Sequence, residues 1–388
     1  MKSKKRIAVC MELIWPYNRH IMINSGIVEY STEHTDWQLE QCEYPEVFMA
    51  RGTKYDGIIG RISKACYEKA AELNIPTVNV WMNSPVRKSI PTVAQDYSET
   101  GRIAAEHLIA RGFKRIVHIG YKKCYSTKLH LQGVQMVARE HGLSCSSYRV
   151  SLKMDENSTE WTKFVSDIQK FQSGWKAPVG IAVVNDEISR SLASMLIYFG
   201  WKIPEEAAIV GAGKNDLICN STNPTLSTIA LACHERGYFA AGLLDKILRG
   251  EKVANEEHFL PSKELVVGES SDIYAVDDPY LAKALKYISN NSDRELSVDH
   301  IAKTVGMSRR TLEYKFKKKL NRTINGEIIR LRIERLKRLL LETDQPVKSL
   351  CSEVGFGTNS HMHNIFKRYT GMTPTQFRKK HITSRAKT

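Results

Sequence analysis

Side chains that can form specific hydrogen bonds with DNA bases occur in two short segments near the C-terminus. Arg310 can donate two hydrogen bonds to guanine, and Glu313 can accept one from cytosine. Asn359 or Asn364 can bond adenine through its amide. Lysines in both segments suit contacts with phosphates. The two segments therefore predict two base-reading surfaces, provided that folded elements present them to the DNA.

The elements that carry these side chains form an internal repeat. Residues 298–307 and 347–356 share apolar, small and glycine positions at an offset of 49 residues. Phe316 matches Phe366 at an offset of 50, so the second copy has one extra residue in its turn. A repeat of this length indicates one structural unit that is used twice.

Each copy is predicted to be a helix-turn-helix motif, over residues 297–320 and 347–370. In the first copy Ser297 caps a helix that ends at Gly306, and Ser308 caps the helix that follows. The second helix of such a motif enters the major groove of DNA. The expected DNA contacts are the outward-facing residues of the two second helices, namely Ser308, Arg309, Arg310, Glu313, Tyr314 and Lys317 in the first copy and Asn359, Ser360, His361, Asn364 and Lys367 in the second.

The charge of the chain is concentrated around the repeat. Residues 281–388 hold 24 basic and 9 acidic side chains, whereas residues 1–280 hold 33 of each. The whole net charge of +15 therefore lies in the C-terminal part. This asymmetry is typical of a nucleic-acid-binding module attached to a neutral domain, and the alternative is a solvated basic face.

The C-terminal part resembles the DNA-binding module of the arabinose-regulator family of transcription factors. The resemblance rests on Gly306-Met307-Ser308 with Phe316-Lys317, on Gly355-Phe356 with Phe366-Lys367, and on Gly-Met-Thr-Pro-Thr-Gln-Phe-Arg at residues 371–378. It implies an all-α domain with two helix-turn-helix motifs and a double-stranded DNA operator as partner. It also favours activation, which would make RNA polymerase a further partner.

The first 268 residues alternate short apolar runs with amphipathic stretches. Strands are expected at Arg6–Met11, Gly57–Ile62, Arg115–Tyr121 and Val179–Val184, for example, each followed by a helix. Regular alternation of this kind predicts an α/β fold with parallel sheets that helices cover on both faces. At this length two such lobes fit side by side, with a small molecule bound at the carboxyl ends of the strands.

This region resembles the sensor domains of lactose-repressor-like regulators, which have the two-lobed fold of periplasmic binding proteins. The resembling segments are residues 96–101, 104–109, 111–113, 116–120, 180–186, 203–211 and 223–229. The resemblance implies two lobes that close on a small molecule. It also implies three chain crossings between the lobes, near 121–126, 228–232 and 260–265.

The resemblance further implies effector contacts in the loops that follow the strands. Tryptophan rings can stack on the apolar faces of a sugar, and Asn, Asp and Arg can bond its hydroxyls. The expected ligand-binding residues are Glu12, Trp15, Asn18, Arg19, Trp81, Asn83, His130, Asn185, Asp186 and Lys214. Trp15 and Trp81 could instead pack within the lobes, and Asp186 could cap the helix that follows it.

The sequence departs from the lactose-repressor-like pattern at two positions that usually hold sugar hydroxyls. His130 stands three residues before Gly133, where arginine is common, and Gly213-Lys214 replaces a usual aspartate. A xylose-like pentose is our first candidate effector. The positive charge of Lys214 makes an acidic sugar or a sugar phosphate the alternative.

Enzymatic function is not expected. The chain has no G-x-S-x-G, P-loop, H-E-x-x-H or complete G-x-G-x-x-G motif. Its eight cysteines form no C-x-x-C pair, so we expect neither a metal site nor a cofactor. Glu12 and Pro16 interrupt the apolar run after the basic start, and no stretch approaches the roughly 18 apolar residues that span a bilayer. We expect a cytoplasmic protein, associated with the nucleoid and not with a membrane.

The predicted organisation is a sensor domain at residues 1–268, a linker at 269–280 and a DNA-binding domain at 281–388. Closure of the lobes on an effector would shift the conformations of the sensor and hence the placement of the two motifs. We expect a homodimer on two half-sites. The predicted function is an effector-responsive transcription regulator, and the alternative is a ligand-independent architectural DNA-binding protein.

Overall fold

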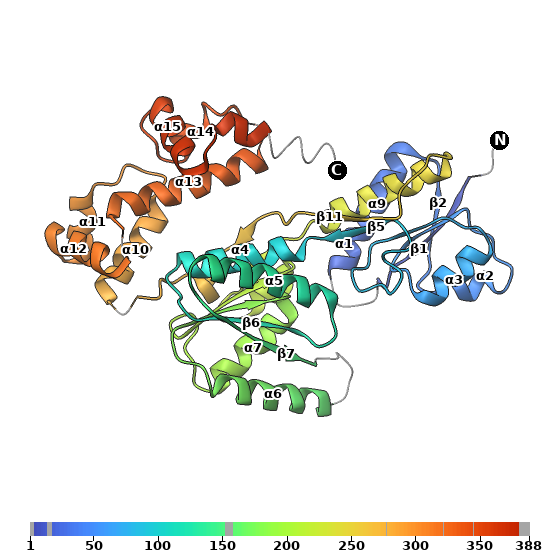
Figure 1. Ribbon diagram of the computed structural model, residues 1–388, viewed down its shortest axis with the longest axis horizontal. Coiled ribbons are helices and arrows are strands. Elements are labelled where there is room, and N and C mark those ends of the chain that lie inside the picture. Colours follow the sequence, from blue (N-terminus) through green and yellow to red (C-terminus); the bar gives the residue numbers. More distant parts are fainter. Residues whose placement is uncertain are drawn as a thin grey trace. The chain divides into compact units, whose positions relative to one another are not determined.

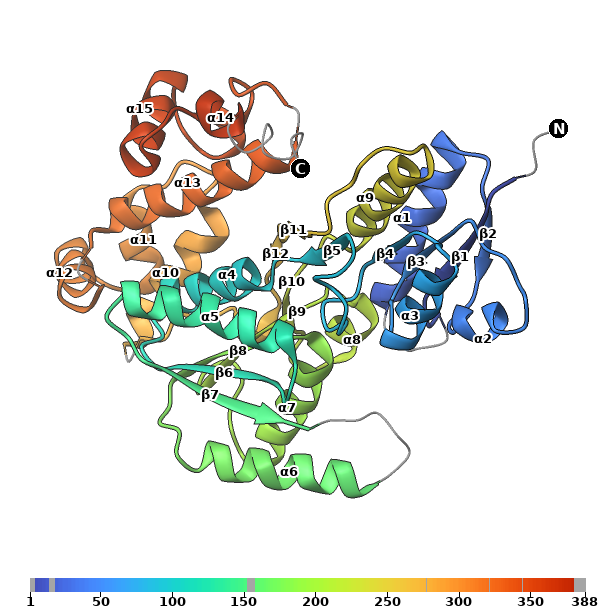
Figure 2. The same cartoon turned by 45° about the vertical axis from the view of Figure 1, so that its right-hand side comes forward.

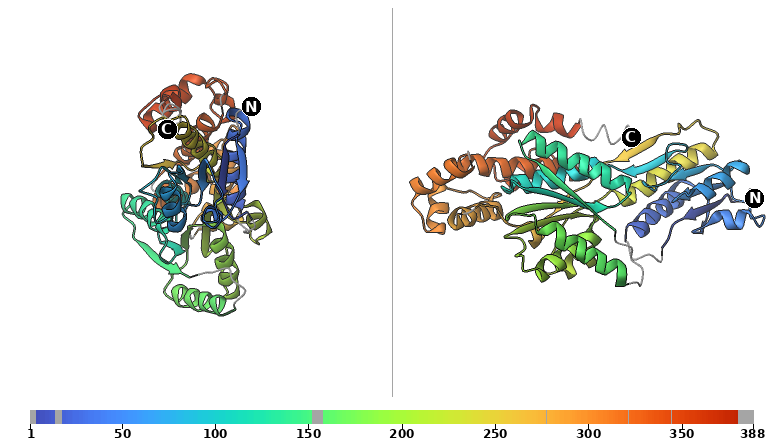
Figure 3. Two further views of the ribbon diagram at one scale, coloured as in Figure 1. Left: turned by 90° about the vertical axis from the view of Figure 1, so that its right-hand side faces the viewer. Right: turned by 60° about the horizontal axis from the view of Figure 1, so that its bottom comes forward.

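The chain folds into two compact units, residues 1–272 and 273–388. The computed structural model describes residues 4–13, 18–151, 158–276, 278–320, 322–343 and 345–379. We call residues 1–272 the sensor unit and residues 273–388 the helical unit. The sensor unit contains two six-stranded sheets, whereas the described part of the helical unit consists of helices and their connections (Figures 1 and 3).

Lobe 1 of the sensor unit is a parallel sheet with the strand order β11-β5-β4-β3-β1-β2. Its strands are β1 (Arg6–Cys10), β2 (Gln38–Gln41), β3 (Gly57–Gly60), β4 (Thr77–Asn79), β5 (Thr92–Gln95) and β11 (Glu257–Leu260). Its helices are α1 (Asn18–His34), α2 (Pro45–Met49), α3 (Lys64–Glu72) and α9 (Cys233–Leu248). Helix α9 covers one face, and α2 and α3 pack on the other face around Ala8 and Ile58. The strands are therefore apolar on both sides, as Ile7 and Ala8 illustrate, both fully buried.

Lobe 2 repeats this design with the strand order β12-β10-β9-β8-β6-β7. Its strands are β6 (Ile116–Tyr121), β7 (Cys145–Val150), β8 (Val179–Val183), β9 (Ala207–Ala212), β10 (Ser227–Ile229) and the antiparallel β12 (Leu265–Val266). Its helices are α4 (Tyr97–Ala110), α5 (Tyr125–Glu140), α6 (Ser158–Gln172), α7 (Asp186–Tyr198) and α8 (Asp216–Ser221). Helices α4 and α5 cover one face, and α6 and α7 the other (Figure 2). The predicted two-lobed α/β fold is thus confirmed.

The chain crosses between the lobes after Gln95, between Ile229 and Cys233, and between Leu260 and Leu265. The second and third crossings lie where the resemblance implies them. The first expected crossing, near 121–126, is wrong, because β6 and α5 on either side of it both belong to lobe 2. The first crossing instead follows β5, the last strand of lobe 1 before the chain enters lobe 2.

The helical unit has two hydrophobic cores, one for each motif. Its helices are α10 (Pro279–Asn291), α11 (Val298–Val305), α12 (Arg309–Leu320), α13 (Ile324–Glu342), α14 (Leu350–Glu353) and α15 (Asn359–Thr370). Leu312 and Phe316 of α12 lie in the first core, and Met362 and Phe366 of α15 lie in the second. The equivalent packing confirms that the repeat is one unit used twice. None of the helices in the described ranges combines the length and apolar composition of a membrane span.

Candidate functional site

Polar side chains gather at the carboxyl ends of the strands in lobe 1. Glu12 follows β1, and its Oε2 lies 2.5 Å from Nη1 of Arg61, which follows β3. The Arg61 guanidinium lies over the Trp81 ring, 4.9 Å from its centroid. In each sheet, the first strand of the lobe, β1 or β6, lies between the next two strands of the chain. The strand order reverses at this point, and ligands bind at such a switch point in open α/β sheets. The structure therefore places Glu12 and Trp81 together, through an arginine that the sequence analysis missed.

A second group of polar side chains joins the two lobes. Arg19, in the first turn of α1, places Nη2 3.5 Å from Oε2 of Glu187, in the first turn of α7. Tyr97 and Tyr121 lie close enough to Arg19 to interact with its charge. Nδ2 of Asn185 donates to the Tyr121 hydroxyl over 3.0 Å. We call these residues and Arg236 the inter-lobe cluster.

Arg236 belongs to the inter-lobe cluster because it interacts electrostatically with Tyr97. Its side chain is buried, and within the described residues its Nε has no hydrogen-bond partner. Burial raises the pKa of the Tyr97 hydroxyl, and Arg19 and Arg236 oppose that shift. Arg61 could have been found as the residue that directly follows a strand. Tyr97 and Arg236 lie in first turns of helices, where no local pattern marks them.

Asn185 and Asp186 are held from several sides. Asn185 caps α7 by accepting from the Ile188 amide over 3.0 Å. Oδ1 of Asp186 accepts from the Thr228 hydroxyl at 2.7 Å, and Oδ2 accepts from the Asn215 amide at 3.1 Å. Burial raises the pKa of Asp186 to about 6, and those two hydrogen bonds oppose the shift. Asp186 therefore ties α7 to β10 and to the start of α8.

Three further expected ligand residues lie in different surroundings. Asn83 accepts from the Tyr125 amide at 2.9 Å and so links lobe 1 to the start of α5. Nζ of Lys214 lies 3.1 Å from Oε1 of Glu264, in a crossing segment. His130 is fully buried in lobe 2 beside His118, with ring centroids 5.2 Å apart, and burial lowers its pKa to about 3.

The two remaining expected ligand residues precede or begin α1. Asn18 is exposed at the start of that helix. Trp15 lies outside the described residues. Among the described residues, no group of three His, Cys, Asp or Glu side chains is placed to hold a metal ion.

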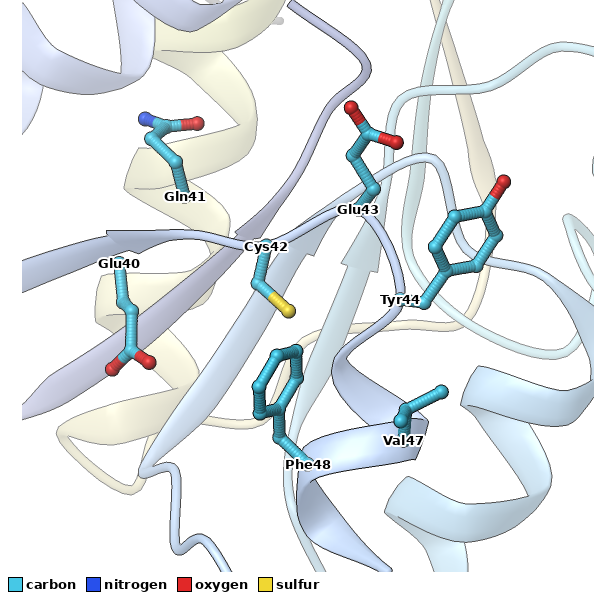
Figure 4. Close-up of a pocket in the computed structure, with 7 residues that line it drawn as sticks. All are labelled: Glu40, Gln41, Cys42, Glu43, Tyr44, Val47 and Phe48. Carbon is cyan, nitrogen blue, oxygen red and sulfur yellow. The ribbon is translucent and has the colours of Figure 1, made fainter.

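A hollow lies on the surface of lobe 1. It is lined by the end of β2 and by α2, and Figure 4 shows its side chains, namely Glu40, Gln41, Cys42, Glu43, Tyr44, Val47 and Phe48. None of them is an expected ligand residue. The hollow adjoins β2, which is an edge strand of its sheet.

The first helix-turn-helix motif presents its expected DNA contacts to solvent. Ser297 caps α11, Gly306 ends it with φ +76°, and Ser308 accepts from the Thr311 amide, as predicted. The expected contacts Ser308, Arg309, Arg310, Glu313, Tyr314 and Lys317 are all exposed. Arg309, however, binds Asp299 and Glu313, each at 2.9 Å. Arg310 is therefore better placed than Arg309 to contact bases.

The second motif presents a similar face. Thr358 caps α15 by accepting from the His361 amide. Ser360, His361, Asn364 and Lys367 are exposed, and Asn359 is half-buried. Within the described residues, Oδ1 of Asn359 has no hydrogen-bond partner. That oxygen is also buried, so the exposed Asn364 is better placed than Asn359 to contact a base.

Both units match known domain families. Residues 105–271 match the family of periplasmic binding protein-like domains, and residues 301–380 match a helix-turn-helix domain family. The chain is a helix-turn-helix transcription regulator with a periplasmic-binding-protein-like sensor. This result confirms the two resemblances that its sequence shows.

The regulator is similar over most of its length to two curated relatives and to one solved structure. It is 24% identical to the xylose operon regulatory protein of Escherichia coli strain K12, over 97% of both chains. It is 26% identical to the xylose operon regulatory protein of Haemophilus influenzae, over 78% of this chain and 79% of the relative. Its fold is similar to the structure of a xylose-binding transcription activator, with a TM-score of 0.61, 21% identity and 97% and 98% of the two chains covered.

Proposed function

We propose that this regulator activates a sugar-utilisation operon and that its effector is a neutral pentose such as D-xylose. The two relatives named above regulate xylose operons, and the similar structure binds xylose. The match to the relative from Escherichia coli extends through the sensor and the DNA-binding unit alike. This continuity supports the same kind of coupling between a sugar and DNA.

The contact between Arg19 and Glu187 across the lobes is the main support for the location of the effector site. Both side chains start from first turns of helices, at the carboxyl ends of the two sheets. Tyr121 and Asn185 add a hydroxyl and an amide at the same place. A polyhydroxylated molecule that bonds residues of both lobes there would stabilise one lobe arrangement over others. Asp186 would contribute by holding Thr228 and Asn215 beside it.

The balance of charge favours a neutral effector over an acidic or phosphorylated one. Arg19 has Glu187 as a partner, Arg61 has Glu12, and Lys214 has Glu264. An anion would have to displace these carboxylates from the cations, whereas sugar hydroxyls can donate to the carboxylates and accept from the cations. Lys214, which motivates the acidic alternative, is thereby neutralised.

The proposed partners follow from this function. The two exposed motif faces would bind a double-stranded operator in the cytoplasm, and RNA polymerase would be the partner in activation. We propose a homodimer, because regulators that bind paired half-sites commonly match them with two-fold symmetry.

Calorimetry with D-xylose, xylonate and a pentose phosphate tests the effector class. We expect D-xylose alone to bind and to raise the melting temperature, since a ligand at 100 times its Kd adds about 2.7 kcal/mol of stability. Arg19→Gln should lower affinity at least tenfold, because lost hydrogen bonds to charged groups cost about 1.5–3 kcal/mol. Arg6→Gln is the matched control, since it removes an arginine–glutamate pair, Arg6 with Glu40, that lies within lobe 1 and does not join the lobes.

The outcomes separate the alternatives. Tighter binding of xylonate or the phosphate would replace the neutral sugar by an anion. Equal affinity in Arg19→Gln and wild type would place the effector elsewhere. If none of the three compounds changed either stability or DNA affinity, the ligand-independent architectural function would be favoured.

A further inference from the structure

Three segments of the helical unit meet at the end of α10. Arg332, on α13, donates from Nε to the carbonyl oxygen of Ser292 at 2.8 Å and from Nη2 to that of Arg294 at 2.7 Å. Its guanidinium also lies over the Phe356 ring, 5.7 Å from the centroid. Ser292 and Arg294 precede the first motif, and Phe356 belongs to the turn of the second. Arg332 therefore contacts both motifs, and we call this place the motif junction.

Gly355 brings the second motif directly against the motif junction. Its φ is +83°, as the turn requires, but a Cβ there would also lie 2.7 Å from the Ser292 carbonyl oxygen. Gly306 occupies the equivalent turn of the first motif, and a Cβ at Gly306 would meet nothing within 4 Å. The close approach at Gly355 is thus not a property of the motif itself. It shows that the turn of the second motif packs on the backbone that leads into the first.

Helix α13 reinforces the connection. Ile324 and Ile328, near its start, belong to the core of the first motif, whereas Ile333, Leu336 and Leu340 belong to the core of the second. The helix has 19 residues, which corresponds to a length of about 28 Å. Arg335 lies about one helical turn beyond Arg332. Its Nη1 is 3.2 Å from Oδ2 of Asp293, so it binds the same segment, residues 292–294, that Arg332 contacts. The two motifs share a helix and, in addition, a set of contacts that opposes bending between them.

We propose that Arg332 is a positioning residue that fixes the distance and angle between the two motifs, so that the regulator accepts only one spacing of its two DNA subsites. This inference rests on the proposed reading of DNA by both motifs. The reading helices α12 and α15 must enter successive major grooves, which lie about 34 Å apart, or roughly 10 base pairs. Adding one base pair turns the second subsite by about 35° around the DNA axis. A flexible joint would absorb that change, whereas the motif junction opposes it.

Arginine is required at this position for a geometric reason. Its planar guanidinium presents donors in a fixed fork, so one side chain can bond two carbonyl oxygens and still lie flat on an aromatic ring. Lysine has the same charge but offers a single ammonium. Arg332→Lys therefore separates the geometry of the junction from its charge, while attraction to phosphates is kept.

The test uses the full chain and a DNA site that the wild type selects from a randomised pool. One base pair is then inserted between the two subsites, and affinities are measured for the original site, the respaced site and each subsite alone. For the wild type we expect respacing to reduce affinity at least about tenfold, the scale of one mismatched base pair. For Arg332→Lys and Arg332→Gln we expect weaker binding to the original site and a respacing penalty below about threefold. Binding to single subsites should match the wild type.

Lys318→Gln serves as the control, because we expect loss of this exposed basic residue of α12 to weaken the original and the respaced site by the same factor and so to leave the respacing penalty unchanged. Should Arg332→Gln fail to fold, Arg332→Lys and Arg335→Gln test the same junction. A respacing penalty in these variants equal to that of the wild type would overturn the proposal. So would an equal loss on single subsites, which would indicate that Arg332 acts on DNA directly or on folding. A wild-type footprint of only one subsite would instead refute the reading of DNA by both motifs.

Discussion

Ser271 and Tyr274 are three positions apart in the chain, yet each is buried in a different unit. The Ser271 hydroxyl is 2.6 Å from that of Ser227 and 2.8 Å from Nε2 of His107, inside the sensor unit. Tyr274 is 4% exposed in the core of the first motif. The segment predicted as a linker, 269–280, thus contains a buried residue of each unit, only three positions apart along the chain. A connection this short can transmit a change in lobe 2 to the first motif.

The connection continues into the reading helix of the first motif. Asp278 caps α10 by accepting from the amides of Tyr280 and Leu281, and it also binds Lys315 of α12. The bond to Lys315 lowers the pKa of the Asp278 carboxyl. A displacement at the start of the helical unit would therefore reach α12 through an ion pair as well as through the core.

Lengthening the connection should uncouple the effector from DNA. Four Gly/Ser residues inserted between Asp272 and Ile273 would form a flexible link. We expect sugar binding and DNA binding to persist separately, while the effect of sugar on DNA affinity, typically 5–150-fold in allosteric proteins, falls to about twofold or less. Calorimetry and gel-shift titrations measure both. The same insertion between Glu251 and Lys252, both exposed, should preserve the coupling, and an equal response of the two insertions would contradict the prediction.

Arg310 and Lys318 should differ in how they affect sequence preference. Both are exposed on α12, but only Arg310 lies in its first turn, where base contacts are expected. Arg310→Ala should cost about 1–3 kcal/mol on the preferred site and relax specificity at one position. Lys318→Ala should weaken preferred and random DNA alike and reduce the salt dependence of binding. Competition titrations on the preferred and the random DNA test this difference. Identical losses of affinity for the two variants would show that Arg310 does not lie on the face of α12 that contacts bases.

Asp186 should make the sensor unit less stable as the pH rises from about 4 to about 6. Its pKa is raised to about 6 in the folded protein and is near 3.9 in an unfolded chain. The folded state therefore binds the proton more tightly, and stability that is present below pH 4 is lost as the pH rises through 6. Asp186→Asn should remove this dependence. The free energy of unfolding of wild type relative to the variant should fall by up to about 3 kcal/mol over that range, and a constant difference would show that Asp186 ionises normally.

Glu327 should be the most costly carboxylate to remove from the helical unit. It is fully buried and binds Arg322 at 2.6 Å and Arg330 at 2.7 Å. Removing one partner of a buried ion pair typically costs about 3–5 kcal/mol, and the partial exposure of the two arginines places Glu327→Ala near the lower limit. Glu313→Ala, which breaks an exposed pair with Arg309, should cost less than about 1 kcal/mol. Urea titrations of both variants compare them, and similar midpoints would show that water already screens Glu327.

Much of the helical unit could be predicted from the sequence because its signals are local. Ser297, Gly306 and Ser308 mark helix ends through hydrogen bonds and backbone angles that involve only neighbouring residues. The spacing of Leu312 and Phe316 defines the buried side of α12 and therefore its exposed side. The alternation of strands and helices likewise determines the two-lobed fold, because helices can cover both faces of a parallel sheet in few ways.

The contacts between distant segments were decided by the tertiary structure. Arg19 and Glu187 are separated by 168 residues and meet because the ends of two sheets face each other in the sensor unit. His130 lies inside lobe 2 beside His118, an orientation that its place before Gly133 does not reveal. Arg332 donates to the carbonyl oxygens of Ser292 and Arg294, which lie 40 and 38 residues earlier in the chain. Local patterns fix which side of an element is buried, whereas the partner buried against it depends on how whole elements pack.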